Sequence, residues 1–590
     1  MNNAQNPNRY ENLIANAQLK RIKVGEIAAF IIVLSVFAIL AFGANELVAP
    51  YPIGKLPNIV LVPSALPSYA AQTTLRMLIA LLLSLGVTFV VAPLAAKNKQ
   101  IEKVLLPLID ILECVPVLGV LSISVVAFIA LFPNSRLGPE SAAIFAIFTS
   151  QVWNMILSFY QSLITVPKDF HDTARVFHLS SWQRFWRIEV PYALPGLIWN
   201  TMISMSSAWF FVVACEAISV SNQTILLPGV GSYISVAIRA ADLNAIFYAI
   251  LTMLIVIFIY DQLLFRPLLH WSERFKPEQT HEINATYSWF YVLLAKTRWF
   301  KMRSGFSARL RSLENLKNLR NLSFLTKPFS WPFSANDGVK TFLKFVWNGV
   351  VLLIIVLSTL TLFNFIRETV TLTEVLHAFY LGAITALKIF ILILVTSLIW
   401  VPIGVWIGLK PAAQRFFQPL TQFLAAFPAN LIYPLLVTLI VQYDLNPNIW
   451  TTPLMILGAQ WYLLFNVIAG AANIPNDLKL TVRNFGLSLR LQWKRLFFPA
   501  IFPYYITGAM SAAAGCWNAS IVADVLSWGE HKVVATGLGQ YIAEHTTTGD
   551  FPRLALGIFV MCCYVILFNR LIWQKLYHLA RERYSFSEGG

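Results

Sequence analysis

Two stretches of sequence, 308 positions apart, decide the architecture of this chain. Residues 166–191 read VPKDFHDTARVFHLSSWQRFWRIEVP, and residues 474–499 read IPNDLKLTVRNFGLSLRLQWKRLFFP. In each copy a proline followed by an aspartate is a helix-start signal, and a second proline ends the segment. Each copy is therefore predicted to form two short amphipathic helices joined by a turn, marked by Gly486 in the second copy. The composition fits a lever moved by a soluble partner, and it also fits an ordinary helix at a membrane surface.

The same shift of 308 aligns residues well beyond these two stretches. Upstream of them the shift becomes 312, which pairs Pro107 with Pro419 and Pro116 with Pro428. Similarity at a fixed spacing over this length indicates that the chain is a tandem duplication of one unit. Pairs matched by the shift of 308 include Trp153 with Trp461, Asp169 with Asp477, Pro195 with Pro503, Trp209 with Trp517, Gly229 with Gly537, Gly231 with Gly539 and Asp242 with Asp550.

The composition places both copies in a membrane. Of the 590 residues, 57% are hydrophobic and only 12% are charged, where a soluble domain carries roughly 25% charged residues. The net charge of +16 invites a nucleic-acid interpretation. However, the Lys and Arg residues lie in short connections between apolar runs, as they do in cytoplasmic loops of membrane proteins. We therefore expect a lipid bilayer, and no nucleic acid, as the partner of this composition.

Apolar runs long enough to cross a bilayer, about 20 residues each, occur twelve times. Pro116 and Pro428 interrupt the third and ninth runs, which predicts broken or re-entrant helices there. The predicted fold is an all-α polytopic membrane protein with about 12 transmembrane helices in two parallel six-span repeats. Basic residues gather in alternate connections, so both termini are predicted to be cytoplasmic. The runs are 27–44, 73–95, 104–131, 141–164, 193–220, 243–265, 344–364, 379–409, 416–442, 451–472, 500–527 and 553–574.

The repeat divides the chain into two units and a linker. The first unit is 1–265, with its core at 70–265, and the second is 344–590, with its core at 375–580. The linker 266–343 holds 13 Lys or Arg against 5 Asp or Glu. It is predicted to be cytoplasmic, either as an interfacial amphipathic piece or as a solvated connection. A solute pathway is expected between the two units.

Each of the two opening stretches resembles the EAA loop of ABC-importer inner-membrane permeases. That loop reads Glu-Ala-Ala, three residues, Gly, nine residues, Ile, one residue, Leu-Pro. The first copy departs from the pattern at His178, where the family has Gly, and the second lacks the acidic start. The ATPase-coupling residues that the resemblance implies are Asp172, Ala174, Arg175, His178, Leu179, Arg187 and Pro191 in the first copy, and Arg483, Phe485, Gly486, Leu487, Arg495 and Pro499 in the second.

Two further segments resemble the nitrate, sulfonate, taurine and bicarbonate branch of that family. They are the fifth-span patterns from Trp209 to Glu216 and from Trp517 to Asp524, each followed by a Gly-x-Gly turn. The resemblance implies a type I importer permease in the bacterial inner (plasma) membrane, in which two units are fused. It also implies a small anion as the solute.

The energy source is expected in other subunits. The chain contains no Gly-x-x-x-x-Gly-Lys-[Ser/Thr] phosphate loop, which is the pattern that cradles ATP. We therefore expect a transport subunit with no enzyme activity, no cofactor and no metal of its own. The family resemblance implies two ABC ATPase subunits or domains, which would bind the ATP and Mg, and an extracytoplasmic solute-binding protein. An alternative from the same 6+6 arrangement is a secondary transporter of the major-facilitator type.

Residues that are ionisable or break helices within apolar spans are candidates for the pathway or a gate. Arg76 and Lys388, which are equivalent under the shift of 312, could attract an anion or extend their charges to the membrane surface. For Glu216 and Asp524 a structural hydrogen bond or a gate contact is expected rather than solute binding. At the two prolines a simple kink is the alternative. The candidates are Arg76, Pro116, Trp209, Glu216, Lys388, Pro428, Trp517 and Asp524, and the ionisable Asp110 and Glu113 of the third run qualify on the same ground.

Overall fold

The computed structural model describes residues 59–133, 135–220, 223–275, 290–291 and 363–584, together with separate positions between 349 and 361. The predicted span 27–44 lies outside this part of the chain, as do more than half of 344–364 and most of the linker. Within the described part, helices make up almost the whole backbone, so the all-α polytopic class is confirmed.

The first copy contains helices and one β-hairpin. Strands β1 and β2 pair antiparallel, with Ala217 opposite Leu226. The elements are η1 Pro63–Ala65, α3 Leu66–Lys97, α4 Lys99–Cys114, α5 Val117–Leu131, α6 Leu137–Ile164, α7 Lys168–Val176, α8 Ser181–Arg184, η2 Phe185–Glu189, α9 Val190–Glu216, β1 Ala217–Val220, β2 Gln223–Leu226, α10 Val230–Arg239, α11 Leu243–Tyr260, η3 Asp261–Phe265, α12 Arg266–Ser272 and η4 Glu273–Phe275.

The second copy repeats this order, including the hairpin, in which Val525 lies opposite Val534. Its elements are α17 Leu372–Gly408, α18 Pro411–Ala426, η7 Ala429–Leu431, α19 Tyr433–Gln442, α20 Pro447–Trp450, α21 Thr452–Leu457, α22 Gln460–Ala472, α23 Asn476–Asn484, α24 Leu489–Gln492, η8 Trp493–Phe497, α25 Phe498–Ala523, β3 Val525–Trp528, β4 His531–Val534, α26 Leu538–Thr548, α27 Phe551–Phe568, η9 Asn569–Trp573 and α28 Gln574–Tyr584.

The backbone follows the duplication seen in the sequence almost residue by residue. Adding 308 to the bounds of α7, α8, η2, β1, β2, α11 and η3 gives the bounds of α23, α24, η8, β3, β4, α27 and η9. Equivalent caps recur as well, since Asp242 and Asp550 each accept hydrogen bonds from backbone amides at the start of α11 and α27. The two copies therefore share one local fold even where their side chains differ.

Seven of the described helices are long and apolar enough to cross a membrane, and two bent helix pairs raise the number to nine. One of the pairs is the predicted ninth run, where α18 and η7–α19 meet at 71° beside Pro428. The third run is likewise broken, because α4 ends at Cys114 and α5 begins at Val117, after Pro116. The breaks predicted at both prolines are present. The 45° bend between α21 and α22 was not predicted, because the residues at that break, Gly458 and Ala459, are not prolines.

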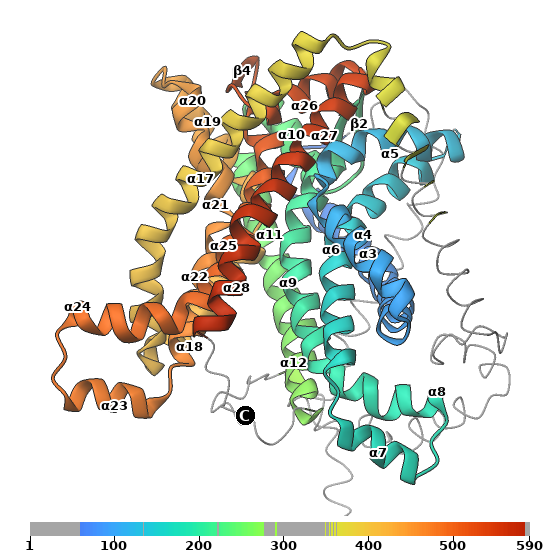
Figure 1. The fold of residues 1–590 in the computed structure, drawn as a ribbon. Helices are drawn as coiled ribbons and strands as arrows, with labels where there is room; N and C mark the ends of the chain where they lie inside the picture. Colours follow the sequence, from blue (N-terminus) through green and yellow to red (C-terminus); the bar gives the residue numbers. More distant parts are fainter. Residues whose placement is uncertain are drawn as a thin grey trace, which may run out of the picture.

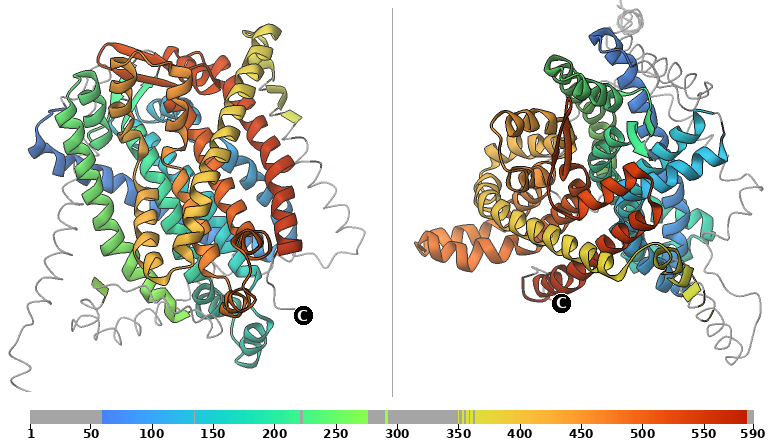
Figure 2. Two further views of the ribbon diagram at one scale, coloured as in Figure 1. Left: turned by 90° about the vertical axis from the view of Figure 1, so that its left-hand side faces the viewer. Right: turned by 90° about the horizontal axis from the view of Figure 1, so that it is seen from above.

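The broken third span of each copy reaches across to the other copy. Helices α4 and α5 contact α27, and α5 also contacts α25 and α26, while α18 contacts α9 and α11 (Figures 1 and 2). Gly119 lies so close to the second copy that a Cβ atom there would be 2.9 Å from Cγ1 of Ile558. Leu118, Leu121 and Val125 of α5 accordingly join the hydrophobic core of the second copy.

The two ends of the helical bundle carry different structures. The helical pairs α7–α8 and α23–α24 project from one end, and the hairpins, α10 and α26 lie at the opposite end (Figure 1). We call α7–α8 with its turn the first arm and α23–α24 with its turn the second arm. Because both arms project at the same end, the two copies run parallel, as the even number of spans predicts.

The contact at Gly119 gives a test of the interface between copies. We expect Gly119→Val to lower the free energy of unfolding by about 1–3 kcal/mol, because extra methyl groups in a packed core force neighbours to move. The measurement is the midpoint of thermal unfolding of the purified chain in detergent. The control is Gly86→Val in α3, where a Cβ atom would meet nothing within 4 Å. Equal midpoints for the two variants would contradict the close contact.

Candidate functional site

Each arm is built around the same turn. In the first arm the Leu179 amide donates to the Ala174 carbonyl and the His178 amide to the Arg175 carbonyl. This pair of bonds is the Schellman motif, which needs a residue of positive φ after the helix. His178 fills that position at φ 48° and Gly486 fills it in the second arm at φ 58°. The departure from the family pattern at His178 therefore changes the residue but leaves the turn intact.

The arms expose large apolar side chains away from the bundle. Phe177 is 70% exposed and its equivalent Phe485 is 75% exposed. Ala174, in contrast, is buried. The exposed pair Arg175 and Asp172 lies 3.3 Å apart, a distance at which a surface ion pair contributes little stability. These features leave each arm with an uncovered aromatic tip beside charged side chains.

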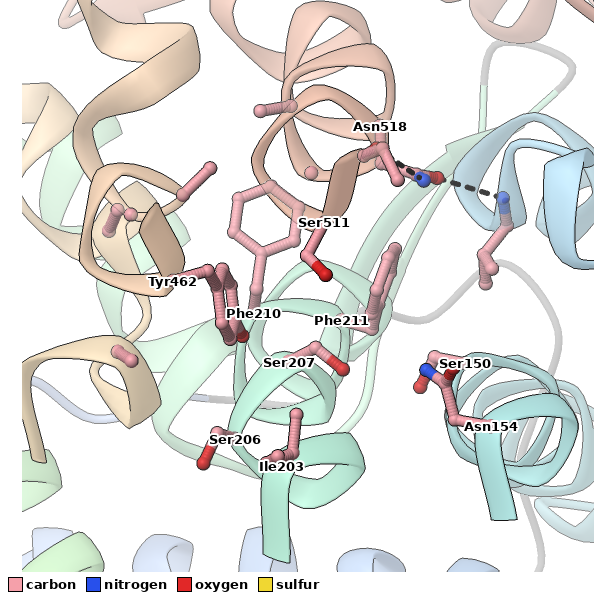
Figure 3. A pocket seen from close by; sticks show the side chains of 18 of the residues that line it. Ser150, Asn154, Ile203, Ser206, Ser207, Phe210, Phe211, Tyr462, Ser511 and Asn518 are labelled. Atoms are coloured by element: carbon pink, nitrogen blue, oxygen red, sulfur yellow. Dashed lines mark hydrogen bonds between the residues drawn. The ribbon is translucent and has the colours of Figure 1, made fainter. Parts of the chain in front are cut away.

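A cavity of about 210 Å³ lies between the two copies. Its wall combines aromatic rings with hydroxyl and amide groups (Figure 3). Figure 3 shows Asn518 accepting a hydrogen bond at the N-terminus of α5, where the amide of Val117 lies 3.1 Å from Oδ1 of Asn518. The labelled side chains come from α6 (Ser150, Asn154), α9 (Ile203, Ser206, Ser207, Phe210, Phe211), α22 (Tyr462) and α25 (Ser511, Asn518).

The cavity lies where the repeat predicts a shared pathway, because equivalent positions of both copies line it. One stripe of α9, with residues three or four positions apart, faces one stripe of α25. Such spacing puts side chains on a single helix face. The equivalent pairs include Asn154 with Tyr462, Ile203 with Ser511, Ser206 with Ala514, Ser207 with Gly515, Phe210 with Asn518 and Phe211 with Ala519.

The wall of this cavity is nearly free of charge. Among the described residues that line it, Glu113 of α4 is the single ionisable acid, and Lys, Arg and His are absent. A cavity with this lining offers neutral hydrogen-bond donors and acceptors together with aromatic faces. It can therefore contact a solute through weak, replaceable bonds without holding it by an ion pair.

The predicted cation Arg76 lies instead in a buried ion cluster near the hairpin end of the first copy. Arg76 is fully buried, with its guanidinium 2.6 Å from Glu140 and 2.6 Å from Glu216. Glu216 also accepts from the Thr73 hydroxyl at 2.7 Å and from the Gly231 amide at 2.7 Å. Two carboxylates thus pair with one buried cation, and further donors satisfy the Glu216 carboxylate, as buried charges require.

The second copy holds a reduced version of the cluster. Lys388 lies 3.3 Å from Asp524 and donates to the Thr536 carbonyl at 2.8 Å. Thr385 accepts from the Leu538 amide, just as Thr73 accepts from the Val230 amide. In both copies the first glycine of the Gly-x-Gly turn lies against the buried carboxylate. A Cβ atom would lie 2.3 Å from Oε2 of Glu216 at Gly229 and 2.4 Å from Oδ2 of Asp524 at Gly537. The glycines are therefore needed for close approach to a carboxylate.

The structure separates the predicted pathway residues into several places. The Arg76–Glu216 and Lys388–Asp524 pairs are outside the lining of the central cavity, and their expected attraction for an anion has no support from their positions. Pro428 lies between two lining residues, Phe427 and Ala429. Pro116 and Trp517 line a neighbouring cavity of about 100 Å³ that also includes Glu113, and Trp209 packs against Tyr260 beside the core of the first copy.

Glu113 is a sequence candidate that does line the cavity, whereas the other side chains of the lining are not among the candidates. Ser150 and Asn154 of α6, and Ser511 and Asn518 of α25, are polar residues within apolar spans, and their separations of four and seven positions put each pair on one helix face. That periodicity was available as a signal in the sequence. The duplication does not reveal it, because the equivalent positions of the other copy are apolar or small.

A family model described as "Binding-protein-dependent transport system inner membrane component" matches residues 85–265 and again residues 400–573. The two matches together cover more than half of the chain. Each match includes one arm and the spans on either side of it. The family is thus represented twice in tandem.

Individual relatives share lower identity over part of the chain. The bicarbonate transport system permease protein CmpB of Synechococcus elongatus is 28% identical over 125 residues, which make up 21% of this chain and 42% of that protein. The nitrate import permease protein NrtB of Leptolyngbya laminosa is 23% identical over 224 residues, 36% of this chain and 77% of that protein. A probable ABC transporter permease protein of Brucella abortus is 26% identical over 242 residues, which make up 40% of this chain and 91% of that protein. No solved structure matches the chain.

The two arm turns yield a reciprocal prediction. His178→Gly should slow amide hydrogen exchange at Leu179 about fivefold, because glycine adopts positive φ without the strain that a side chain meets there. Gly486→Ala should speed exchange at Leu487 by a similar factor. Exchange followed by mass spectrometry over each arm measures both effects. If exchange at Leu179 is unchanged in His178→Gly, the positive-φ turn is not what limits opening of the first arm.

Proposed function

The chain belongs to the family of binding-protein-dependent transport system inner membrane components, and from this membership we propose that it couples two ATPase subunits to one solute pathway. Membership decides against the major-facilitator alternative. The observation that carries the coupling proposal is the pair of arms projecting from one end of the bundle (Figure 1). Each arm presents an exposed aromatic tip, Phe177 or Phe485, on a short helix held by the same turn.

Two arms in one chain set the stoichiometry that we propose. Each arm would bind one ABC ATPase subunit or domain, so a single copy of this chain takes the place of a permease dimer. ATP and Mg would be held by those partners. The arms would lie on the cytoplasmic side together with both termini, because basic residues concentrate in the connections at that side. An extracytoplasmic solute-binding protein would then approach the hairpin end.

The central cavity is the proposed solute pathway. It lies between the copies, and equivalent faces of α9 and α25 line it, so a shift of one copy against the other would change its shape. In the names of its relatives, bicarbonate and nitrate are the solutes, and we propose a small anion for this chain. Neutral hydroxyl and amide donors would contact the anion, and the absence of Lys and Arg from the described lining would let it leave.

The coupling proposal is tested by reversing charge on both arms. The double variant Arg175→Glu and Arg483→Glu should lose at least tenfold of the ATPase that co-purifies from native membranes, and transport should fall with it, because the two arginines lie beside the exposed tips. Arg239→Glu makes the same change on α10 at the opposite end of the bundle and serves as the control. Undiminished uptake by the double variant would count against coupling through the arms.

The solute proposal makes a prediction about Glu113. If the solute is an anion, Glu113→Gln should raise its uptake several-fold at low concentration, because a negative charge is removed from the cavity wall. Uptake of labelled bicarbonate and nitrate into cells measures the effect, and the control is Glu102→Gln, the same change on α4 outside the described lining. A fall in anion uptake, or a selective loss of cation uptake, would overturn the assignment of an anion.

A further inference from the structure

The base of the second arm encloses an open cavity of about 500 Å³. It lies between the end of α17 and the α23–α24 turn. Leu409, Leu496 and Phe497 form an apolar wall, and Lys479 and Arg483, one helical turn apart on α23, add two cationic groups. Among the described residues neither cation has an ion pair. Burial lowers the pKa of Lys479, which is the effect of partial desolvation without a nearby carboxylate.

The first arm uses the equivalent positions for an ionic network. Glu189 lies 2.7 Å from Lys97 and 3.0 Å from Arg184, and the Lys97 ammonium also lies over the ring of Phe185, 5.1 Å from its centre. The network ties the base of the first arm to the end of α3. In the second copy the three charged positions are occupied by Leu409, Gln492 and Phe497. The ion pairs at the base of the first arm thus correspond to apolar residues and a cavity at the base of the second arm.

The cavity lies at the level expected for lipid headgroups. Lys410, the N-cap residue of α18 directly after Leu409, has its Nζ 4.6 Å from the ring centre of Trp406 near the end of α17, and Trp406 is 51% exposed. Tryptophan and lysine at the end of an apolar span are typical of the membrane interface. Exposed apolar residues also continue along one face of α17 toward Leu409, and they are Val395, Leu398, Ile399 and Trp406.

From this combination we propose that the cavity binds one anionic phospholipid. Its phosphate lies between Lys479 and Arg483, and one acyl chain follows the apolar face of α17 past Leu409 and Phe497. Two basic groups beside an apolar surface at the cytoplasmic interface are the chemistry that recognises an anionic headgroup. The second arm would therefore be supported by lipid where the first is supported by its own ion pairs. This inference depends neither on the solute nor on the identity of the ATPase.

Retention of lipid by the purified full-length chain tests the proposal. The chain is extracted with detergent, mixed with phosphatidylglycerol or phosphatidylcholine, and examined by native mass spectrometry. We expect the wild-type chain to retain one phosphatidylglycerol molecule. In Lys479→Gln the fraction of chains that retain this lipid should fall about fivefold. The triple variant Leu409→Lys, Gln492→Arg and Phe497→Glu, which installs the network of the first copy, should lose it as well. The matched control is His171→Gln, at the position equivalent to Lys479 in the first arm.

Three outcomes would overturn the lipid assignment. Equal retention of phosphatidylglycerol by wild type and Lys479→Gln would show that the lipid is not bound at Lys479. Displacement of the lipid by micromolar inorganic phosphate would point to a soluble anion instead. Unchanged lipid retention combined with loss of ATPase binding in Lys479→Gln would make the cavity part of the ATPase interface. Lys479→Gln carries the decision if the triple variant fails to fold, because it changes one partly exposed side chain.

Discussion

The whole arrangement depends on an interrupted backbone in the third span of each copy. A proline has no amide hydrogen and removes one hydrogen bond from a helix, and α4 stops before Pro116 and α18 before Pro428, whereas Pro93 and Pro402 lie inside continuous helices. The change of direction carries both spans across the boundary between copies, where α5 packs on α25, α26 and α27. The cavity lined by equivalent faces of α9 and α25 is the result.

Within this common framework the two copies have diverged in chemistry. Where the first copy surrounds Arg76 with Glu140 and Glu216, the second has the single pair Lys388 and Asp524. Where the first fastens its arm with ion pairs around Glu189, the second has an apolar wall. Buried ionic clusters hold their partners in one geometry because separation leaves a charge unpaired in a poor solvent. The first copy is consequently the more tightly fastened half, and the second is the half with fewer ionic constraints.

Much of this could be predicted from the sequence, for identifiable reasons. The apolar runs and the spacing of 308 predicted the spans and the duplication, because both depend on local patterns that a linear chain displays. The breaks at Pro116 and Pro428 were predictable because proline acts on its own backbone. The partners of Arg76 were not, since Glu140 and Glu216 lie 64 and 140 positions away and only the packing of α3, α6 and α9 brings them together. The cavity-lining Asn518 and Ser207 could not be predicted from the duplication, because their equivalents Phe210 and Gly515 are apolar or small.

The reach of α5 into the other half also imposes an order on biosynthesis. The amide of Val117 is satisfied by a side chain 401 residues further along the chain, and Ser122 bonds a partner 424 residues away. At roughly 5–20 residues per second of translation, about 20 to 80 seconds pass before those partners emerge from the ribosome. During that interval the newly inserted first half has an unfinished face within the bilayer. Lipids or membrane chaperones are the neighbours that can cover it until the nascent chain is complete.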